Sequence, residues 1–222
     1  MMQNQHIQRS TGYSGIAFVV VAVGGAVLPG IPPDSTAPGS EIAAFLNGHR
    51  TMWMLSTWLA LPAVAFFLWF AAGLNTFLRT ATEPDEALLS WGFAGAIAAA
   101  TMYFVFSGIQ CALIYHGIPT GGSDFMRGGF DVLNILASYF FAPFAIFVGA
   151  ASLSVRRHHA LPIWLSSLGF VAVAVDGIGT LAPFFRSGPL APGAIYVVLG
   201  FFVPMIWIIA ISLAMIRTPG MR

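Results

Sequence analysis

Hydrophobic residues occur along this chain in six long uncharged stretches that are separated by short polar segments. A helix needs about 20 predominantly apolar residues to cross a bilayer, and the six stretches reach or approach that length. Only the fifth stretch is interrupted by a charged residue, Asp176. The pattern predicts an all-α fold, a polytopic bundle with six transmembrane spans over residues 13–29, 52–78, 87–115, 132–155, 161–185 and 191–216.

The amino-acid composition agrees with this fold class. Hydrophobic residues make up 58% of the 222 positions and charged residues only 8%, whereas a soluble domain carries roughly 25% charged residues. A soluble fold cannot hide that much apolar surface. The spans and their loops use nearly the whole length, so we expect a single transmembrane domain over residues 1–222.

The arginines predict which loops face the cytoplasm, because loops on that side are enriched in positive charge. The chain has no lysine, and all nine basic residues are arginine. We place the protein in a bacterial plasma membrane. If both termini lie on the cytoplasmic side, more arginines fall in the cytoplasm than outside the cell, which favours that orientation. The inside set is Arg9, Arg79, Arg156, Arg157, Arg217 and Arg222, and the outside set is Arg50, Arg127 and Arg186.

The first stretch is the shortest and follows a basic residue, Arg9. A secretory signal peptide therefore has to be considered, with Ser35-Thr36-Ala37 as an acceptable cleavage site. We expect this segment to be retained as the first span.

The longest outer loop, residues 31–51, predicts a short helix at the membrane surface. Ser40 is a suitable N-cap, and Glu41 would follow in the first turn, where negative charge is favoured. Asn47-Gly48 is expected to end this helix. Its apolar residues recur at helical spacing and are expected to lie on the membrane surface; they are Ile42, Phe45 and Leu46.

Asp176 is the strongest single indication of a site, because an ionisable residue inside lipid is costly. At about 1.5 Å per residue it lies roughly 13 Å from the outer end of its span, so we expect it to face the bundle interior or to be protonated. One helical face carries Gly169, Ala172, Asp176 and Thr180. The small residues on that face would let a neighbouring helix approach closely.

Further polar residues fall in the outer half of the predicted bundle, and the inner half holds far fewer. Span two is entered through His49-Arg50, span three carries a polar stripe that ends at His116, and span four begins at Asp131. The candidate ligand-binding residues are Asp176, Asp131, Asn134, Gln110, His49, Arg50, His116, Tyr103, Ser107 and Thr180.

Two interpretations of these residues remain open. They can line a water-filled cavity that opens outward. Alternatively, they can satisfy one another, for example through an Arg50–Asp131 pair and a hydrogen bond from Gln110 or Tyr103 to Asp176.

Several other kinds of chemistry are not favoured by the residue types and their spacing. The basic residues do not cluster as a nucleic-acid interface requires. No zinc-ligand motif, phosphate-binding loop or dinucleotide fingerprint is present. The histidines fall at span ends or in loops, which disfavours a haem, and the single cysteine, Cys111, excludes an intrachain disulfide. We therefore expect no cofactor and no nucleic-acid partner.

The chain resembles a family of six-helix bacterial membrane proteins that are common in actinobacteria and have no known function. The resemblance covers the overall layout. It is carried by His49-Arg50, by Phe66-Phe67-Leu68-Trp69-Phe70 before Leu74 and Arg79, and by Asp131-x-x-Asn134. It implies a six-span topology and no particular activity, and Asp176 is not part of the family's pattern.

Three functional hypotheses follow from the sequence. The first is a protein that binds or transports a small molecule or an ion in an outward-facing polar cavity, with Asp176 and Asp131 as its titratable groups. The second is a membrane-embedded enzyme for a lipid or isoprenoid, with one of these carboxyls as general acid and His49 or His116 as its partner. The third is an accessory subunit without a site, which packs against other chains or against copies of itself and is surrounded by lipid.

Overall fold

A computed structural model describes residues 2–33, 36–81, 86–117 and 122–217. Two residues named above, Ser35 and Arg222, lie outside the described residues. The helices are α1 (Met2–Val27), α2 (Gly39–Gly48), α3 (Arg50–Ala81), α4 (Glu86–Ala112), the π-helix η1 (Leu113–Gly117), α6 (Ser123–His158), α7 (Ile163–Gly179), the 3-10 helix η2 (Ala182–Phe184) and α8 (Ile195–Arg217).

The predicted fold class is confirmed. The described part of the chain is all-helical and contains six helices that are long and apolar enough to cross a membrane. These spans are His6–Val27, Arg50–Thr80, Ala87–Tyr115, Ser123–His158, Ile163–Phe184 and Ile195–Arg217. The protein is therefore a multi-pass membrane protein that is in contact with lipid.

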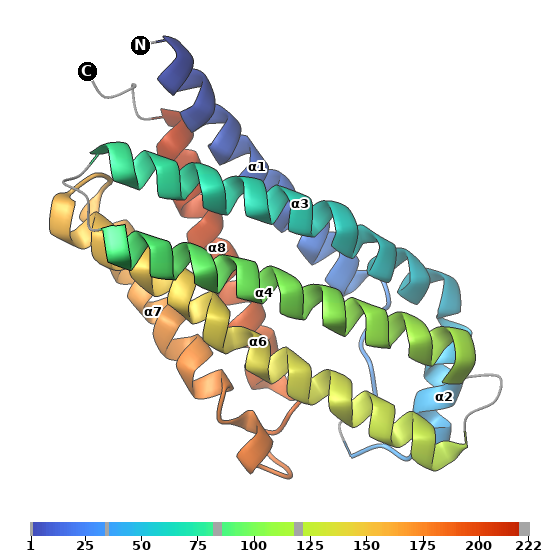
Figure 1. The fold of residues 1–222 in the computed structure, drawn as a ribbon. Helices are drawn as coiled ribbons and strands as arrows, with labels where there is room; N and C mark the ends of the chain where they lie inside the picture. The colour runs from blue at the N-terminus through green and yellow to red at the C-terminus, as the bar shows by residue number, and fades with distance from the viewer. Residues whose placement is uncertain (1, 34–35, 82–85, 118–121, 218–222) are drawn as a thin grey trace.

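The six long helices form a closed ring (Figure 1). α3 packs against α1 and α4, α6 packs against α4 and α7, and α8 packs against α7 and α1. The start of α1 and the end of α8 lie at one end of this ring, which we call the terminal end, and α2 lies at the other, which we call the α2 end. Gln8 of α1 donates a hydrogen bond to the Met215 carbonyl of α8 at 2.8 Å, which ties the first span to the last.

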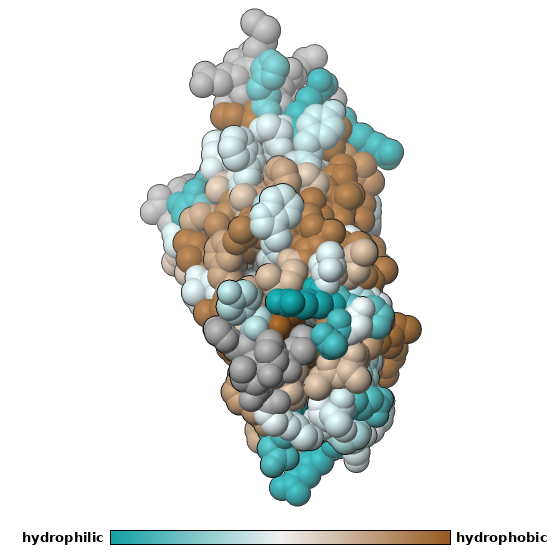
Figure 2. Space-filling view, turned by 90° about the vertical axis from the view of Figure 1, so that its right-hand side faces the viewer, coloured by the Kyte–Doolittle hydropathy of each residue, from teal (hydrophilic) through white to brown (hydrophobic). Residues whose placement is uncertain are grey.

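The surface has the distribution expected of a bundle that spans a bilayer. Figure 2 shows apolar side chains across the middle of one face, with hydrophilic side chains toward both ends and in a patch in the lower half. Large apolar side chains such as Val20, Trp69 and Ile206 are exposed on the spans. The orientation of the bundle in the membrane stays a prediction.

The bounds of several spans differ from those predicted: α1 is already helical at Met2, ahead of residue 13, and α8 begins at Ile195 rather than at residue 191. α6 begins at Ser123 rather than near residue 132, because Arg127 and Asp131 neutralise each other within the first turns (Arg127 Nε to Asp131 Oδ2, 3.1 Å). α7 ends at Gly179, and the 3-10 helix η2 follows it. Helix α6 therefore begins before the charge-free stretch from which the span was predicted.

The predicted helix in the longest loop exists as α2, but its start and its packing differ. Pro38 and not Ser40 occupies the N-cap, and no side chain caps the helix there. Ile42 and Leu46 are buried in a small core with Trp53 of α3, so they do not lie on the membrane surface as expected. α2 instead covers the end of the bundle by packing against α3, η1 and α6.

Candidate functional site

The bundle encloses one large cavity, which we call the bundle cavity, with a volume of about 540 Å³. Its described lining comes from α1, α3, α4, α6 and α8 and from the segments that precede α2 and α8. No described residue of α7 lines it. A volume of this size lies within the range of about 300–1,000 Å³ that is typical of small-molecule sites.

Aromatic rings form a continuous wall along the cavity. Five ring contacts connect six lining residues, with centroid separations of 5.1, 5.5, 5.3, 6.1 and 6.4 Å from one ring to the next. The order of these rings, which we call the aromatic wall, is Phe18, Phe67, Phe144, Phe140, Tyr103 and Phe106.

Several polar side chains line the cavity toward the α2 end, where α3 begins and α4 ends. Trp53, Gln110 and Asn134 are among them, and we call these three the polar end of the cavity. The indole N–H of Trp53 and the Nδ2 amide of Asn134 are buried and have no hydrogen-bond partner among the described residues. Because a buried N–H is costly to leave unpaired, each is available to a ligand oxygen.

The backbone beside Asn134 is shaped for that side chain. Gly193 has a φ of +81°, a conformation that favours glycine. A Cβ at this position would lie 2.8 Å from Asn134 Oδ1. Gly193 therefore lets the loop before α8 close over the amide.

The cavity reaches the surface between α1 and α8. Ile31, which follows α1, is 92% exposed, and Val198 of α8 is 44% exposed, and both residues line the cavity. The two helices lie close together at the terminal end and diverge toward the α2 end (Figure 1). Part of the lining is therefore exposed on the side of the bundle between these two helices.

Four of the residues suggested by the sequence meet in this cavity. Tyr103, Ser107 and Gln110 of α4 and Asn134 of α6 all line it. The rest of the lining is mainly apolar and aromatic, so the cavity differs from the polar, water-filled one that we expected. Polar contacts are concentrated at one end of an apolar chamber.

The remaining suggested residues lie elsewhere. Asp131 pairs with Arg127 and not with Arg50, and Arg127 also donates to the Ala37 carbonyl at 2.6 Å. His49 caps α2 and is exposed, as is Arg50. The Thr180 hydroxyl donates to the Gly177 carbonyl at 2.7 Å. The side chain of His116 lies outside the described residues.

Asp176 is fully buried at 0% exposure on α7 and does not line the cavity. Neither carboxyl oxygen has a hydrogen-bond partner in the part of the chain that the structure describes. One turn later on the same face, Gly179 packs against Phe141, whose ring also lines the cavity. The hydrogen bond from Gln110 or Tyr103 to Asp176 that we considered is absent among the described residues.

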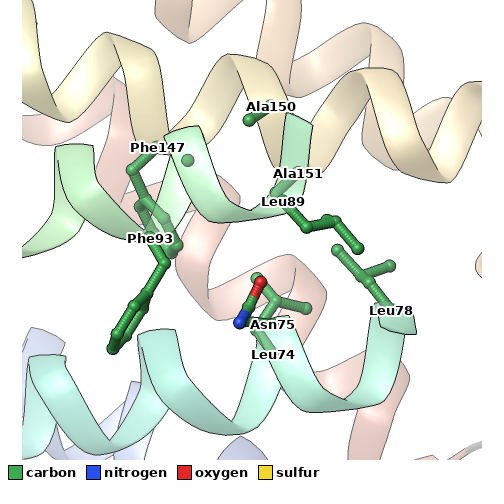
Figure 3. Close-up of a pocket in the computed structure, with 9 residues that line it drawn as sticks. Leu74, Asn75, Leu78, Leu89, Phe93, Phe147, Ala150 and Ala151 are labelled. Carbon is green, nitrogen blue, oxygen red and sulfur yellow. The ribbon is translucent and has the colours of Figure 1, made fainter. Parts of the chain in front are cut away.

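A second, much smaller pocket lies between α3, α4 and α6 near the terminal end (Figure 3). Its volume is about 10 Å³, which is about the room of one water molecule. Asn75 reaches into it from α3 among apolar side chains, and its Oδ1 atom has no described partner. The pocket is too small to hold a ligand.

Sequence reasoning missed Trp53 and Gly193 at the cavity, and it missed polar residues at the terminal end. The hydroxyls of Ser152, Ser166 and Ser212 are buried there without a described partner. Serine is common in membrane helices, so a serine in the sequence does not by itself indicate a buried polar site. The positive-φ turn at Gly193 has no pattern in the sequence that separates it from Gly188.

Comparisons with known proteins identify no relative of this chain. No family model, no curated protein and no solved structure matches it.

Proposed function

We propose that this protein binds a small, mainly apolar molecule that it takes from the membrane into the bundle cavity. The observation that carries the proposal is the cavity itself, which combines an aromatic wall with two buried N–H donors at one end that have no partner among the described residues. Ligand sites characteristically combine an apolar lining with a few polar groups that orient the ligand.

The geometry favours binding over the enzyme hypothesis. A general acid must lie within hydrogen-bond reach of the group that it protonates. Asp176 does not line the cavity, and Asp131 is paired with Arg127 near the first turns of α6. Neither carboxyl is therefore available to a molecule in the bundle cavity.

We further propose that the protein resides in a bacterial plasma membrane with both termini in the cytoplasm. The distribution of arginines supports this orientation. The resemblance to six-helix actinobacterial membrane proteins, in the segments around His49-Arg50 and Asp131, supports the location. In this orientation the polar end of the cavity faces the outer half of the bilayer.

The cavity can be tested with one substitution made at two places on α6. Ala137 lines the cavity, whereas Ala142 is exposed and does not. We expect Ala137→Phe to fill the cavity and lower the affinity for decylbenzene at least about tenfold, which corresponds to about 1.4 kcal/mol. Ala142→Phe should bind decylbenzene like the wild type.

Binding is measured by isothermal titration in lipid nanodiscs, with empty nanodiscs as the blank. Thermal melting of the same samples reports folding, and a ligand that binds only the folded state should raise the melting temperature. Equal affinity in both variants and the wild type would contradict the proposal.

A further inference from the structure

The described residues that line the bundle cavity carry no charge. No aspartate, glutamate, arginine or histidine is among them. A charged group that enters an apolar chamber loses its hydration, and here it would gain no ion partner. The lining therefore selects an uncharged ligand.

The polar end selects an acceptor on that ligand. The Trp53 indole is only a donor, and its Nε1 is buried without a described partner. Asn134 Nδ2, from a different helix, is a second buried donor that lacks a partner among the described residues. A carbonyl oxygen satisfies such donors without introducing a charge or a further donor that needs a partner.

The lining is also unusually aromatic. Eleven of its 33 described residues are Phe, Tyr or Trp, whereas the whole sequence is 14% aromatic. Within the aromatic wall, the Tyr103 and Phe106 rings lie nearly parallel at 8°, and Phe140 and Phe144 are stacked at 25°. Parallel rings along one side of a chamber match a flat ligand, since aromatic groups favour offset stacking.

We propose that the ligand is an uncharged, planar ring compound with carbonyl oxygens and an apolar tail, a quinone being the simplest example. Its ring lies along the aromatic wall, and its carbonyl oxygens accept hydrogen bonds from Trp53 Nε1 and Asn134 Nδ2. This assignment rests on the proposed function, because it specifies the chemistry of the molecule in the bundle cavity. It includes no redox step.

The experiment compares three probes with similar alkyl tails in nanodiscs. Decylubiquinone has the ring and its carbonyls, decylbenzene has a ring without them, and decanoate has a charge without a ring. We expect the wild type to bind decylubiquinone about tenfold more tightly than decylbenzene, the ratio that two net hydrogen bonds provide. Decanoate should bind more weakly than either.

Two substitutions remove the donors one at a time. Trp53→Phe keeps an aromatic ring beside Phe45 but removes the indole N–H, and Asn134→Leu replaces the amide with an apolar group of similar size. Each should reduce the preference for decylubiquinone over decylbenzene about threefold, because each removes one of the two hydrogen bonds. The affinity for decylbenzene should stay within about twofold of the wild type, which also shows that the variant is folded.

Two glycine substitutions test the role of Asn134 in a second way. Gly193→Ala places a methyl group against the Asn134 amide, whereas Gly188→Ala places one in open space. Both glycines have positive φ, so the backbone strain of the two variants is similar. We expect only Gly193→Ala to lose preference for decylubiquinone.

The outcomes separate this inference from the proposed function. If decylubiquinone and decylbenzene bind equally and Ala137→Phe excludes both, the cavity binds apolar molecules and the carbonyl assignment is overturned. If decanoate binds as tightly as decylubiquinone, the proposal that the ligand is uncharged is overturned. If no probe binds, or if Ala137→Phe has no effect on any of them, the proposed function itself fails.

Discussion

Asp176, the residue that the sequence marked most strongly, lies apart from the bundle cavity, on a helix none of whose described residues line it. It is fully buried on α7, and both carboxyl oxygens lack a partner among the described residues. The bundle cavity is lined by the other five spans. At the scale of single residues, the groups best placed to hold a ligand are instead neutral donors, Trp53 Nε1 and Asn134 Nδ2.

We predict that Asp176→Asn leaves binding to the cavity unchanged. The amide has nearly the same volume as the carboxyl and no charge, so it avoids the cost of burying an ion. Affinity for decylbenzene should stay within about twofold of the wild type, and the melting temperature should be equal or higher. Asp131→Asn, which loses the partly exposed pair with Arg127, is the control and should change stability by about 1 kcal/mol or less.

A large loss of binding in Asp176→Asn with normal melting would link this carboxyl to the cavity, as the sequence suggested. It would also reopen the enzyme hypothesis for that residue.

At the scale of helices, close contacts at small residues determine how the ring is packed. Gly169 of α7 lies against Ser152 of α6, and a Cβ there would also come within 2.7 Å of Trp207 Nε1 of α8. Trp207 in turn donates to the Leu165 carbonyl at 3.1 Å. Three helices therefore meet at Gly169, where small residues allow close approach in the absence of a hydrophobic driving force.

The substitution Gly169→Ala tests this packing. The added methyl group meets Ser152 and Trp207, and overpacking of this kind costs about 1–3 kcal/mol. Gly177→Ala, on the same helix, adds the same group in open space and should be tolerated. Thermal melting in detergent measures the stability of both variants. Equal melting temperatures would show that the contact between α6, α7 and α8 accommodates the added methyl group at little cost.

For the whole molecule, the ring has two different ends. The terminal end holds the start of α1 and the end of α8, and the α2 end is covered by a helix whose Ile42 and Leu46 pack into the protein. The cavity lies toward the α2 end and reaches the surface where α1 and α8 diverge. The side of the membrane that the α2 end faces therefore decides which leaflet supplies a ligand.

Cysteine labelling tests the predicted orientation. In a Cys111→Ala background, His159→Cys places a thiol at the terminal end and Ser187→Cys places one at the other end, and both positions are exposed. With both termini inside, a membrane-impermeant maleimide should label Ser187→Cys in intact cells. It should label His159→Cys only after the membrane is permeabilised, and the reverse pattern would invert the orientation.

The amino-acid sequence is sufficient to predict the six spans, because the hydropathy of a stretch of about 20 residues is a local property that needs no knowledge of its neighbours. It also identified four of the cavity residues, Tyr103, Ser107, Gln110 and Asn134, since polar groups are rare inside such stretches. Its errors at α2 and at the start of α6 arose where local signals, the N-cap and the charges, were overridden by packing and by an ion pair.

Which helix faces meet is a property of the folded bundle and could not be predicted from any one segment of the chain. The closed ring joins α8 to α1, leaves α7 out of the cavity lining and separates Asp176 from Gln110. It brings Trp53, from the start of α3, beside apolar residues that are spread along most of the chain. The rotation of each helix about its axis depends on side-chain packing with its neighbours, and polar spacing along one helix does not specify it.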